Sequence, residues 1–247
     1  VALAQRERID LVVVGPEDAL AAGIADRLRD VGVAVFGPSA EAARLEASKS
    51  FAKAFMARHR IPTARYADFD RLDDALAYVR EHGGRCVVKA DGLAAGKGVA
   101  MCETPAAAEA ALRETMGERR FGDAGASVVI EEWLDGEEAS YYALCDGERI
   151  VPLAAAQDHK RALDGDRGEN TGGMGAYSPA PVFTDAVEKQ VLERVVLPTV
   201  RGMAAEGHPY RGVLFVGLMI DPAGDARVIE FNVRFGDPET QPLVMRL

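Results

Sequence analysis

Apolar residues fall along the chain in short runs that alternate with segments of helical spacing. Within residues 1–62, two apolar runs flank a segment with helical spacing that ends at Gly32. A strand, a helix and a strand in close succession predict a βαβ unit with a parallel pair of strands. Ser39 then caps a predicted long helix, 41–59, which Pro62 stops. We expect a partial α/β domain in this part.

From residue 63 onward the pattern changes to strands joined by short turns. Residues 63–140 combine strand-like apolar runs with helices, one of them opened by Thr104 and Pro105. Residues 141–247 contain a predicted hairpin, a helix over 184–206 and two further paired strands. We therefore predict a mixed α/β and α+β chain with three parts, 1–62, 63–140 and 141–247, of which the last two carry antiparallel sheets.

A Gly- and Asn-rich stretch, residues 158–181, separates the hairpin from the long helix. Loops of this length without secondary structure are uncommon and are usually functional or disordered. We expect this stretch to be a loop that is either functional or disordered.

Composition limits the function classes. The chain has 247 residues, 48% of them hydrophobic, and 39 acidic against 29 basic residues give a net charge of -10. This balance disfavours general nucleic-acid binding, which needs a basic face. No apolar run reaches the roughly 18 residues that span a membrane, and no signal segment opens the chain. We expect a cytoplasmic protein whose three cysteines are small buried residues.

Both ends of the sequence suggest a fragment. The chain begins with Val, and its last residues, "ETQPLVMRL", break off inside an apolar segment with helical character. We expect that it was cut from a longer protein.

The segment "VVKADGLAAGKGVAMCE", residues 87–103, contains two predicted strands joined by a loop. Lysines and glycines are concentrated at the end of the first strand and in this loop. Glycines let backbone N–H groups turn toward an anion, and the lysines add positive charge. The spacing does not fit a Walker A loop, which places its lysine before Ser or Thr at the start of a helix, nor a dinucleotide fingerprint. A flap over a triphosphate and an ordinary flexible hairpin both remain open. The residues concerned are Lys89, Gly92, Gly96, Lys97 and Gly98.

Glu230, Asn232 and Arg234 occupy alternate positions of a predicted strand, so their side chains project from one face. Carboxylate and amide oxygens suit Mg²⁺, and a guanidinium suits the charge that develops on a transferring phosphoryl group. An exposed edge strand with a Glu–Arg pair is the alternative. The opposite, buried side is expected to consist of Ile229, Phe231, Val233 and Phe235.

A third candidate segment lies at residues 131–138, where a predicted strand ends. An adenine base needs an apolar slot and extended backbone, which Glu131, Glu132, Trp133 and Leu134 could present, and Glu138 could meet ribose hydroxyls. A strand end with solvated acidic residues is the alternative.

These motifs, in this order, resemble the ATP-grasp superfamily. More closely, "KADGLAAGKGV", "EEWLDGEEAS", "QDHKRALDGDRGENTGGMGAYSPAP" and "NVRFGDPETQP" are similar to phosphoribosylamine–glycine ligases, also called glycinamide ribonucleotide synthetases. The resemblance covers essentially the whole chain. It implies an ATP-grasp fold preceded by part of a parallel α/β domain, without the start of that domain and without the C-terminal domain of the family.

The resemblance also implies an activity, an ATP-dependent carboxylate–amine ligation in de novo purine synthesis. Glycine would form glycyl phosphate with ATP, and 5-phosphoribosylamine would displace phosphate to give glycinamide ribonucleotide. The implied cofactors are ATP and Mg²⁺ (or Mn²⁺), and no nucleic-acid or membrane partner is expected. The oligomeric state is left open.

The resemblance assigns residues to each role, together with the motifs above. For catalysis they are Arg234, Lys97, Asp158 and Lys160. For the nucleotide they are Lys49, Lys89, Gly92, Gly96, Lys97, Gly98, Glu131, Glu132, Trp133, Leu134 and Glu138. For the substrates they are Gly15, Pro16, Glu17, Asp158, Lys160, Asn170, Gly172, Gly173, Met174, Arg234 and Asp237. For the metal they are Glu230 and Asn232.

Two other interpretations remain open. Another ATP-grasp ligase or carboxylase would share the flap and the Glu-x-Asn-x-Arg strand, but not "NTGGMGAYSP" with "RFGDPETQ". A fragment of this kind could also bind ATP without turning it over.

The sequence departs from the ATP-grasp pattern at one point. The strand at 212–220 lacks the further carboxylate that many ATP-grasp enzymes carry there, and the nearest acid is Asp221.

Overall fold

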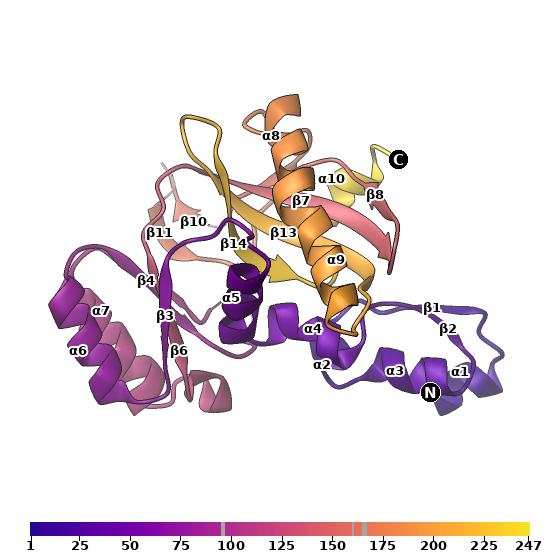
Figure 1. The fold of residues 1–247 in the computed structure, drawn as a ribbon, viewed down its shortest axis with the longest axis horizontal. Coiled ribbons are helices and arrows are strands. Elements are labelled where there is room, and N and C mark those ends of the chain that lie inside the picture. Colours follow the sequence, from indigo (N-terminus) through magenta and orange to yellow (C-terminus); the bar gives the residue numbers. More distant parts are fainter. Residues whose placement is uncertain (95–96, 160, 165–166) are drawn as a thin grey trace.

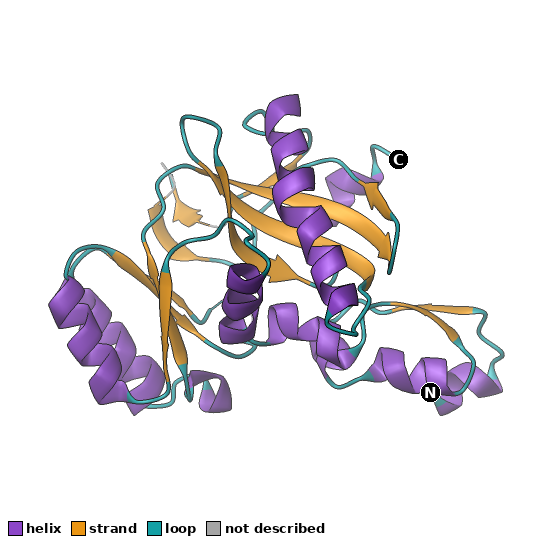
Figure 2. Ribbon diagram, viewed as in Figure 1, coloured by secondary structure: helices purple, strands orange, loops and turns teal. Residues whose placement is uncertain are grey.

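The computed structural model describes residues 1–94, 97–159, 161–164 and 167–247. Figure 1 labels the elements on an elongated molecule, and Figure 2 separates its helices from its strands. The helices are α1 (Ala2–Arg6), α2 (Glu17–Ala21), α3 (Ile24–Asp30), α4 (Ala40–Ala47), α5 (Lys49–Arg58), α6 (Leu72–His82), α7 (Pro105–Leu112), α8 (Asp185–Val191), α9 (Leu197–Ala205) and α10 (Thr240–Val244), with helical turns η1 (Arg113–Gly117), η2 (Gly122–Gly125) and η3 (Leu192–Val196).

The strands in the described ranges form two four-stranded sheets and three short pairs. They are β1 (Leu11–Val13), β2 (Ala34–Phe36), β3 (Tyr66–Phe69), β4 (Cys86–Ala90), β5 (Val99–Cys102), β6 (Val128–Glu132), β7 (Glu137–Asp146), β8 (Ile150–Pro152), β9 (Gln157–Asp158), β10 (Arg161–Leu163), β11 (Arg167–Asn170), β12 (Ala176–Tyr177), β13 (Arg211–Ile220) and β14 (Ala226–Asn232).

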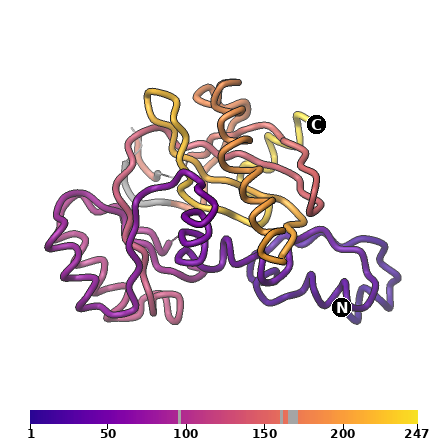
Figure 3. Tube along the Cα trace, viewed as in Figure 1, coloured from indigo at the N-terminus to yellow at the C-terminus, as the bar shows by residue number. Residues whose placement is uncertain are grey.

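The N-terminal part is the predicted βαβ unit, since β1 and β2 pair in parallel with Leu11 opposite Ala34. The helical segment between them is not one helix. It divides into α2 and α3 at Gly23, whose φ of +78° is a conformation that favours glycine. In Figure 3 this part, which contains the N-terminus, lies at one end of the molecule.

The prediction of one long helix over 41–59 is wrong, because the helix stops and restarts at Ser48. Ser48 has φ -140° and ψ 114°, which is extended backbone, and its side chain accepts a hydrogen bond from the Phe51 N–H. It therefore ends α4 and caps α5. The break places Lys49 in the first turn of a new helix rather than in the middle of an old one.

The small sheet has the order β3-β6-β4-β5 and is antiparallel throughout, as predicted. α6 and α7 lie side by side against one of its faces (Figure 1). Leu76 from α6 and Leu112 from α7 pack there against Val88 and Ile130. Because residues alternate along a strand, Val87 and Lys89 of β4 project from the opposite face.

The central sheet has the order β14-β13-β7-β8 and is also antiparallel. The continuous helical rod α8–η3–α9 covers one face, where Val191 and Met203 pack against Tyr141 and Leu214. The other face carries the neighbouring residues of the same strands, including Phe215. This second face is turned toward the small sheet.

One residue fixes the passage from the small sheet to the central sheet. A Cβ on Gly136 would lie 2.3 Å from the carbonyl oxygen of Ile220, far closer than packed atoms approach. The connection between β6 and β7 therefore lies directly against the end of β13, and only glycine fits there.

The segment 158–181 is more structured than the sequence predicted. Its described residues form four short strands, which pair as β10 with β11 and β12 with β9. Asp158 of β9 faces Ala176 of β12 in this arrangement. Among the helices of the described ranges, none has both the length and the apolar character needed to cross a membrane.

Candidate active site

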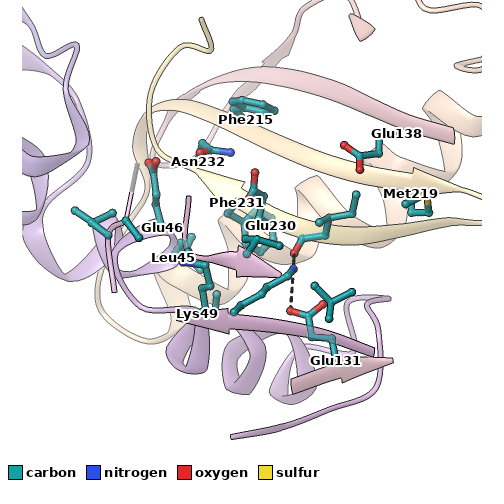
Figure 4. Close-up of a pocket in the computed structure, with 18 of the residues that line it drawn as sticks. Leu45, Glu46, Lys49, Glu131, Glu138, Phe215, Met219, Glu230, Phe231 and Asn232 are labelled. Carbon is teal, nitrogen blue, oxygen red and sulfur yellow. Dashed lines mark hydrogen bonds and ion pairs between the residues drawn. The ribbon is translucent and has the colours of Figure 1, made fainter. Parts of the chain in front are cut away.

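A cavity of about 280 Å³ lies between the small sheet and the central sheet. Residues from helices α4 and α5, from β4 to β6 and from β13 and β14 line it. Figure 4 shows Lys49 and Glu131 on one side of this space and Glu230, Asn232 and Phe215 on the other. The predicted flap motif and the predicted Glu-x-Asn-x-Arg motif are thus brought to one cavity.

Two lysines supply the cationic wall. Lys89, at the end of β4, is only 3% exposed; its Nζ lies 3.0 Å from the Ile229 carbonyl oxygen and 2.9 Å from a carboxylate oxygen of Glu131. Lys49 donates to the Gly92 carbonyl oxygen at 3.1 Å. Burial lowers the pKa of Lys49, and the attraction of Glu230 opposes this shift. Both cations are held close to the loop that follows β4.

The helix break at Ser48 fixes this cationic wall to the loop. The Asp91 carboxylate accepts from the Ser50 N–H at 2.7 Å and from the Ser50 hydroxyl at 3.0 Å. The Asp91 carbonyl oxygen also accepts from the Lys49 N–H at 3.1 Å. The start of the glycine loop is therefore bound to the N-terminus of α5, where free N–H groups favour an acidic partner.

The glycine loop lies over the cavity only in part. Leu93, Ala94 and Gly98 line it, whereas Gly92 packs on Ala124. Two predicted residues are placed differently: the exposed Lys97 is not among the lining residues, and Gly96 lies outside the described residues. A Cβ on Gly98 would lie 2.8 Å from the Cβ of Ala94, so the close return of the loop requires glycine there.

The acidic wall comes from β14, where one extra residue changes which side chains face the cavity. Gly217 of β13 pairs with Glu230, but its neighbour Leu218 pairs with Val228, so Ile229 is bulged out of the register. Before the bulge Val228 lies in the core; after it Phe231 does. Glu230 and Asn232 consequently face the cavity.

The expected buried side of this strand is therefore correct only in part. Phe231 and Val233 lie in the main core, as predicted. Ile229 was expected beside them, but the bulge turns it to the cavity. Phe235, beyond the end of the strand, packs instead with Tyr142 and Phe215 on the other face of the sheet.

The donor set at Glu230 and Asn232 fits Mg²⁺. Both offer hard oxygen ligands, and Mg²⁺ commonly takes one or two protein ligands and completes its octahedron with phosphate and water. Asn232 is 8% exposed, and its Nδ2 has no hydrogen-bond partner among the described residues. No cluster of three or more His, Cys, Asp or Glu residues with metal-binding geometry occurs in the described ranges, so a metal here would depend on ligands from the nucleotide.

Arg234 lies at the edge of the cavity and is held by two carboxylates. Its Nε donates to Glu17 at 2.8 Å and its Nη2 lies 3.2 Å from Glu46. Nη2 also approaches the Asn232 amide oxygen at 3.3 Å. Arg234 thus ties the N-terminal part to β14, in addition to facing the cavity.

Glu46 was not predicted from the sequence. It lies in the last turn of α4, accepts from the Val233 N–H at 2.7 Å and lines the cavity. Burial raises the pKa of Glu46 to about 7, although Arg234 and the Val233 N–H both favour its charged form. A lone Glu in a helical sequence gives no signal for this role, since the contact joins residues far apart in the chain.

The predicted adenine segment divides between the cavity and the surface. Glu131, Glu132, Leu134 and Glu138 line the cavity. Trp133 does not; its indole donates to Asp135 at 3.0 Å and lies under the Arg85 guanidinium. Apolar lining that the sequence did not predict comes from Val87, Val99, Met101 and Met219. The alternation along β4 and β5 was the signal for it.

The predicted substrate residues are brought together at the other end of the cavity. Glu17, Asp158, Gly172, Arg234 and Asp237 line it. Thr171, which belongs to the same predicted substrate segment, lies there too, as does Glu239, which was not predicted.

Several predicted substrate residues lie elsewhere or are not described. Gly15, Pro16, Gly173 and Met174 are not among the lining residues, and Met174 is exposed. Lys160 and the side chain of Asn170 lie outside the described residues.

Comparison with protein families explains why these segments meet. A family model described as the ATP-grasp (A) domain of phosphoribosylglycinamide synthetase matches residues 47–240, and its N domain matches residues 1–46. The chain belongs to the phosphoribosylglycinamide synthetase family. The predicted resemblance and the predicted fold, an ATP-grasp fold preceded by an N domain, are both confirmed. The boundary between the two matches, at residues 46 and 47, lies in the last turn of α4, just before the Ser48 break.

Individual relatives agree with this family. The chain is 61% identical over 246 residues to the phosphoribosylamine–glycine ligase of Xanthomonas axonopodis pv. citri, covering 100% of the chain and 57% of that protein. It is 57% identical over 247 residues to that of Vibrio parahaemolyticus, covering 100% of the chain and 58% of that protein. The chain therefore spans just over half the length of these synthetase-family relatives.

Solved structures give the same fold. The phosphoribosylamine–glycine ligase of Thermotoga maritima matches with a TM-score of 0.78 and 40% identity, over 85% of this chain and 53% of that one. A biotin carboxylase–βγ-ATP complex from Campylobacter jejuni matches with a TM-score of 0.79 and 18% identity, over 99% of this chain and 53% of that one. The second likeness concerns the fold alone.

Proposed function

We propose that this chain carries the nucleotide site and part of the substrate site of a phosphoribosylamine–glycine ligase. A glycine carboxylate oxygen attacks the γ-phosphorus of ATP, the bond to the β-phosphate oxygen breaks, and ADP leaves. The amine nitrogen of 5-phosphoribosylamine then attacks the carbonyl carbon of glycyl phosphate. Phosphate leaves, the nitrogen loses a proton, and glycinamide ribonucleotide forms.

The chemistry asks the protein mainly for positioning and for charge neutralisation. Lys49, Lys89 and the backbone of the glycine loop hold the phosphates, and Val87, Met101 and Met219 offer apolar surface to the base. A mixed anhydride is readily hydrolysed, so the loop over the cavity also serves by keeping water out.

Glu230 and Asn232 are the residues that would hold Mg²⁺ (or Mn²⁺), which when bound neutralises charge on the phosphate oxygens. Arg234 keeps the Asn232 amide oriented through its contact with the amide oxygen. Its position at the edge of the cavity, near Asp158 and Asp237, also suits it to the carboxylate of glycine. These acidic neighbours suit the amino groups of the two substrates.

One observation carries the proposal: cations and hard oxygen ligands face each other across a single cavity. Lys49 belongs to α5, which precedes the small sheet, and Lys89 belongs to β4 of that sheet. Glu230 and Asn232 belong to β14 of the central sheet, across the cavity (Figure 4). A solvated hairpin or an exposed edge strand would have placed these groups on unrelated surfaces. The family match makes glycine and 5-phosphoribosylamine the substrates to test.

The test is glycine-dependent release of ADP from Mg-ATP with 5-phosphoribosylamine as acceptor. We expect Glu230→Gln to lower the rate about 100-fold or more. The change removes a carboxylate that would hold the divalent cation, whose positive charge stabilises the transferring phosphoryl group. The exposed carboxylate of Glu103 provides a matched control, and Glu103→Gln should retain the wild-type rate.

Three outcomes would contradict the proposal. ADP release that does not depend on glycine, release that is supported by bicarbonate instead, or a wild-type rate for Glu230→Gln would each be incompatible with it. Calorimetry with Mg-ATP, run beside the assay, distinguishes a chain that binds the nucleotide without turnover from one that does not bind it.

A further inference from the structure

Lys53 is a charged residue buried beside the nucleotide cavity without lining it. It lies one turn after Lys49 on α5, so both project from the same side of the helix. Lys49 faces the cavity, but Lys53 is only 2% exposed. A lysine is almost never buried to this degree unless it is paired.

The partners of Lys53 belong to a buried network. Its Nζ donates to the Thr63 hydroxyl at 2.7 Å and lies 2.9 Å from Oε2 of Glu131. The other oxygen of Glu131, Oε1, lies 2.9 Å from the Nζ of Lys89. One carboxylate, itself 4% exposed, therefore lies between two ammonium groups.

The charges of this network do not cancel. Two ammonium groups and one carboxylate leave one positive charge, and of the two cations only Lys89 lines the cavity. Without Lys53, Glu131 and Lys89 would form a closed pair with no net charge. The neutral pair would attract a phosphate less, because the carboxylate would offset the only ammonium near it.

We propose that Lys53 is a positioning residue that occupies one side of Glu131 and so leaves the charge of Lys89 available to the nucleotide phosphates. This inference rests on the proposed function, since it assumes that the cavity binds a nucleotide. Lys53 touches neither the nucleotide nor the reacting atoms; it acts through Glu131.

The surroundings of Lys53 favour a role in charge over a role in packing. Burying an ammonium costs free energy that an apolar side chain of similar length would not require. The position is also joined to the metal-binding strand, because the Thr63 hydroxyl donates in turn to the Val228 carbonyl oxygen at 2.6 Å. Lys53 thereby contacts the small sheet directly and the central sheet through one hydroxyl.

The test measures the dissociation constant of Mg-ATP by calorimetry on the 247-residue chain. We expect Lys53→Met to weaken binding about tenfold, as the loss of one nearby positive charge would. Lys53→Arg, which keeps the charge, should bind within about threefold of wild type. The decisive variant is the double change Lys53→Met with Glu131→Gln, which restores one net positive charge at Lys89 and should recover most of the affinity.

A second measurement compares wild type with Lys53→Arg, so that a long cationic side chain is kept at position 53. Raising the pH from 7 to 10 should weaken Mg-ATP binding by wild type more than by Lys53→Arg, because only the lysine loses its proton in this range. The groups that face Lys53 are Glu131, Lys89, Glu132, Thr63 and the ring of Tyr66. This comparison holds even if Lys53→Met fails to fold.

The outcomes separate this inference from the proposed function. If wild type does not bind Mg-ATP, the proposed function fails and the inference fails with it. If wild type binds and Lys53→Met binds equally well, the inference alone is overturned. A double variant that binds no better than Lys53→Met would also overturn it, since a purely structural defect is not repaired by removing a second charge.

Discussion

At the scale of single residues, Lys53 carries its charge in surroundings that favour a neutral side chain. Burial lowers the pKa of Lys53 from 10.5 to about 8, with the attraction of Glu131 opposing and the repulsion of Lys89 adding to this shift. The unfolded chain keeps the proton to about pH 10.5, whereas the folded chain releases it near pH 8. Unfolding therefore takes up a proton between these values.

The sign of the pH effect follows from this uptake. Stability contributed by Lys53 should rise as the pH increases from 8 to 10.5, by about 3 kcal/mol over the full window. Urea unfolding of wild type and Lys53→Met at pH 7, 8, 9 and 10 measures this contribution. The free energy of unfolding of wild type, relative to that of the variant, should increase with pH. A difference that stays constant with pH would show that Lys53 does not titrate in the folded chain.

The residues that could be predicted from the sequence are those whose role shows in a local pattern. Lys89 ends an apolar run beside a glycine loop, and Glu230 alternates with Asn232 on a strand, so the type and spacing of the side chains indicated the chemistry. Glu46 and Lys53 have no such pattern. Their roles depend on contacts with Arg234 and Glu131, far along the chain, which helical spacing does not reveal.

At the scale of secondary-structure elements, the position of the glycine loop depends on the close approach of Gly98 to Ala90 and Ala94. A Cβ at Gly98 would meet the Cβ of Ala94 at 2.8 Å and that of Ala90 at 3.1 Å. The loop would have to move away from the cavity to accommodate it.

We expect Gly98→Ala to lower the free energy of unfolding by about 1–2 kcal/mol and to weaken Mg-ATP binding. Gly117→Ala is the matched control, because a Cβ there would lie 3.6 Å from a methyl group of Leu72, an ordinary contact. Thermal unfolding and calorimetry on both variants provide the comparison. Unchanged binding by Gly98→Ala would show that the position of this loop does not matter to the nucleotide.

Element types were predicted better than element ends. The antiparallel sheets, the parallel pair and the helix over 184–206 follow from periodicity, which burial of one face imposes on the sequence. The break at Ser48 was missed because Ser is tolerated in helices and the hydrophobic spacing continues across it. Only the tertiary contacts of Ser50 with Asp91 show why the helix restarts there.

At the scale of the whole molecule, the cavity exists only because two sheets lie against each other. Its cationic wall comes from one side of the β6–β7 connection, and Glu230 and Asn232 come from the other (Figures 1 and 4). The sequence predicted both motifs, but their opposition across one cavity could not be deduced from spacing, since more than a hundred residues separate Lys89 from Glu230.

A ligand that contacts both walls should stabilise the fold as a unit. Mg-ATP at about 100 times its dissociation constant is expected to add about 2.7 kcal/mol and to raise the melting temperature by roughly 5–10 °C. Differential scanning fluorimetry measures the shift, with Lys89→Met as the variant that should show little of it. An equal shift in that variant would mean that the nucleotide binds elsewhere.

The bulge at Ile229 has a consequence for how the chain tolerates insertions and deletions. One surplus residue in β14 decides that Glu230 and Asn232 point outward from the core and Phe231 inward. Removing Ile229 itself would leave Val228 opposite Leu218 and Glu230 opposite Gly217, so both sets would keep their faces. Removing Phe231 would instead put Asn232 opposite Val216 and send its amide under the α8–α9 helices. A deletion is therefore tolerated at the bulge and harmful two residues later.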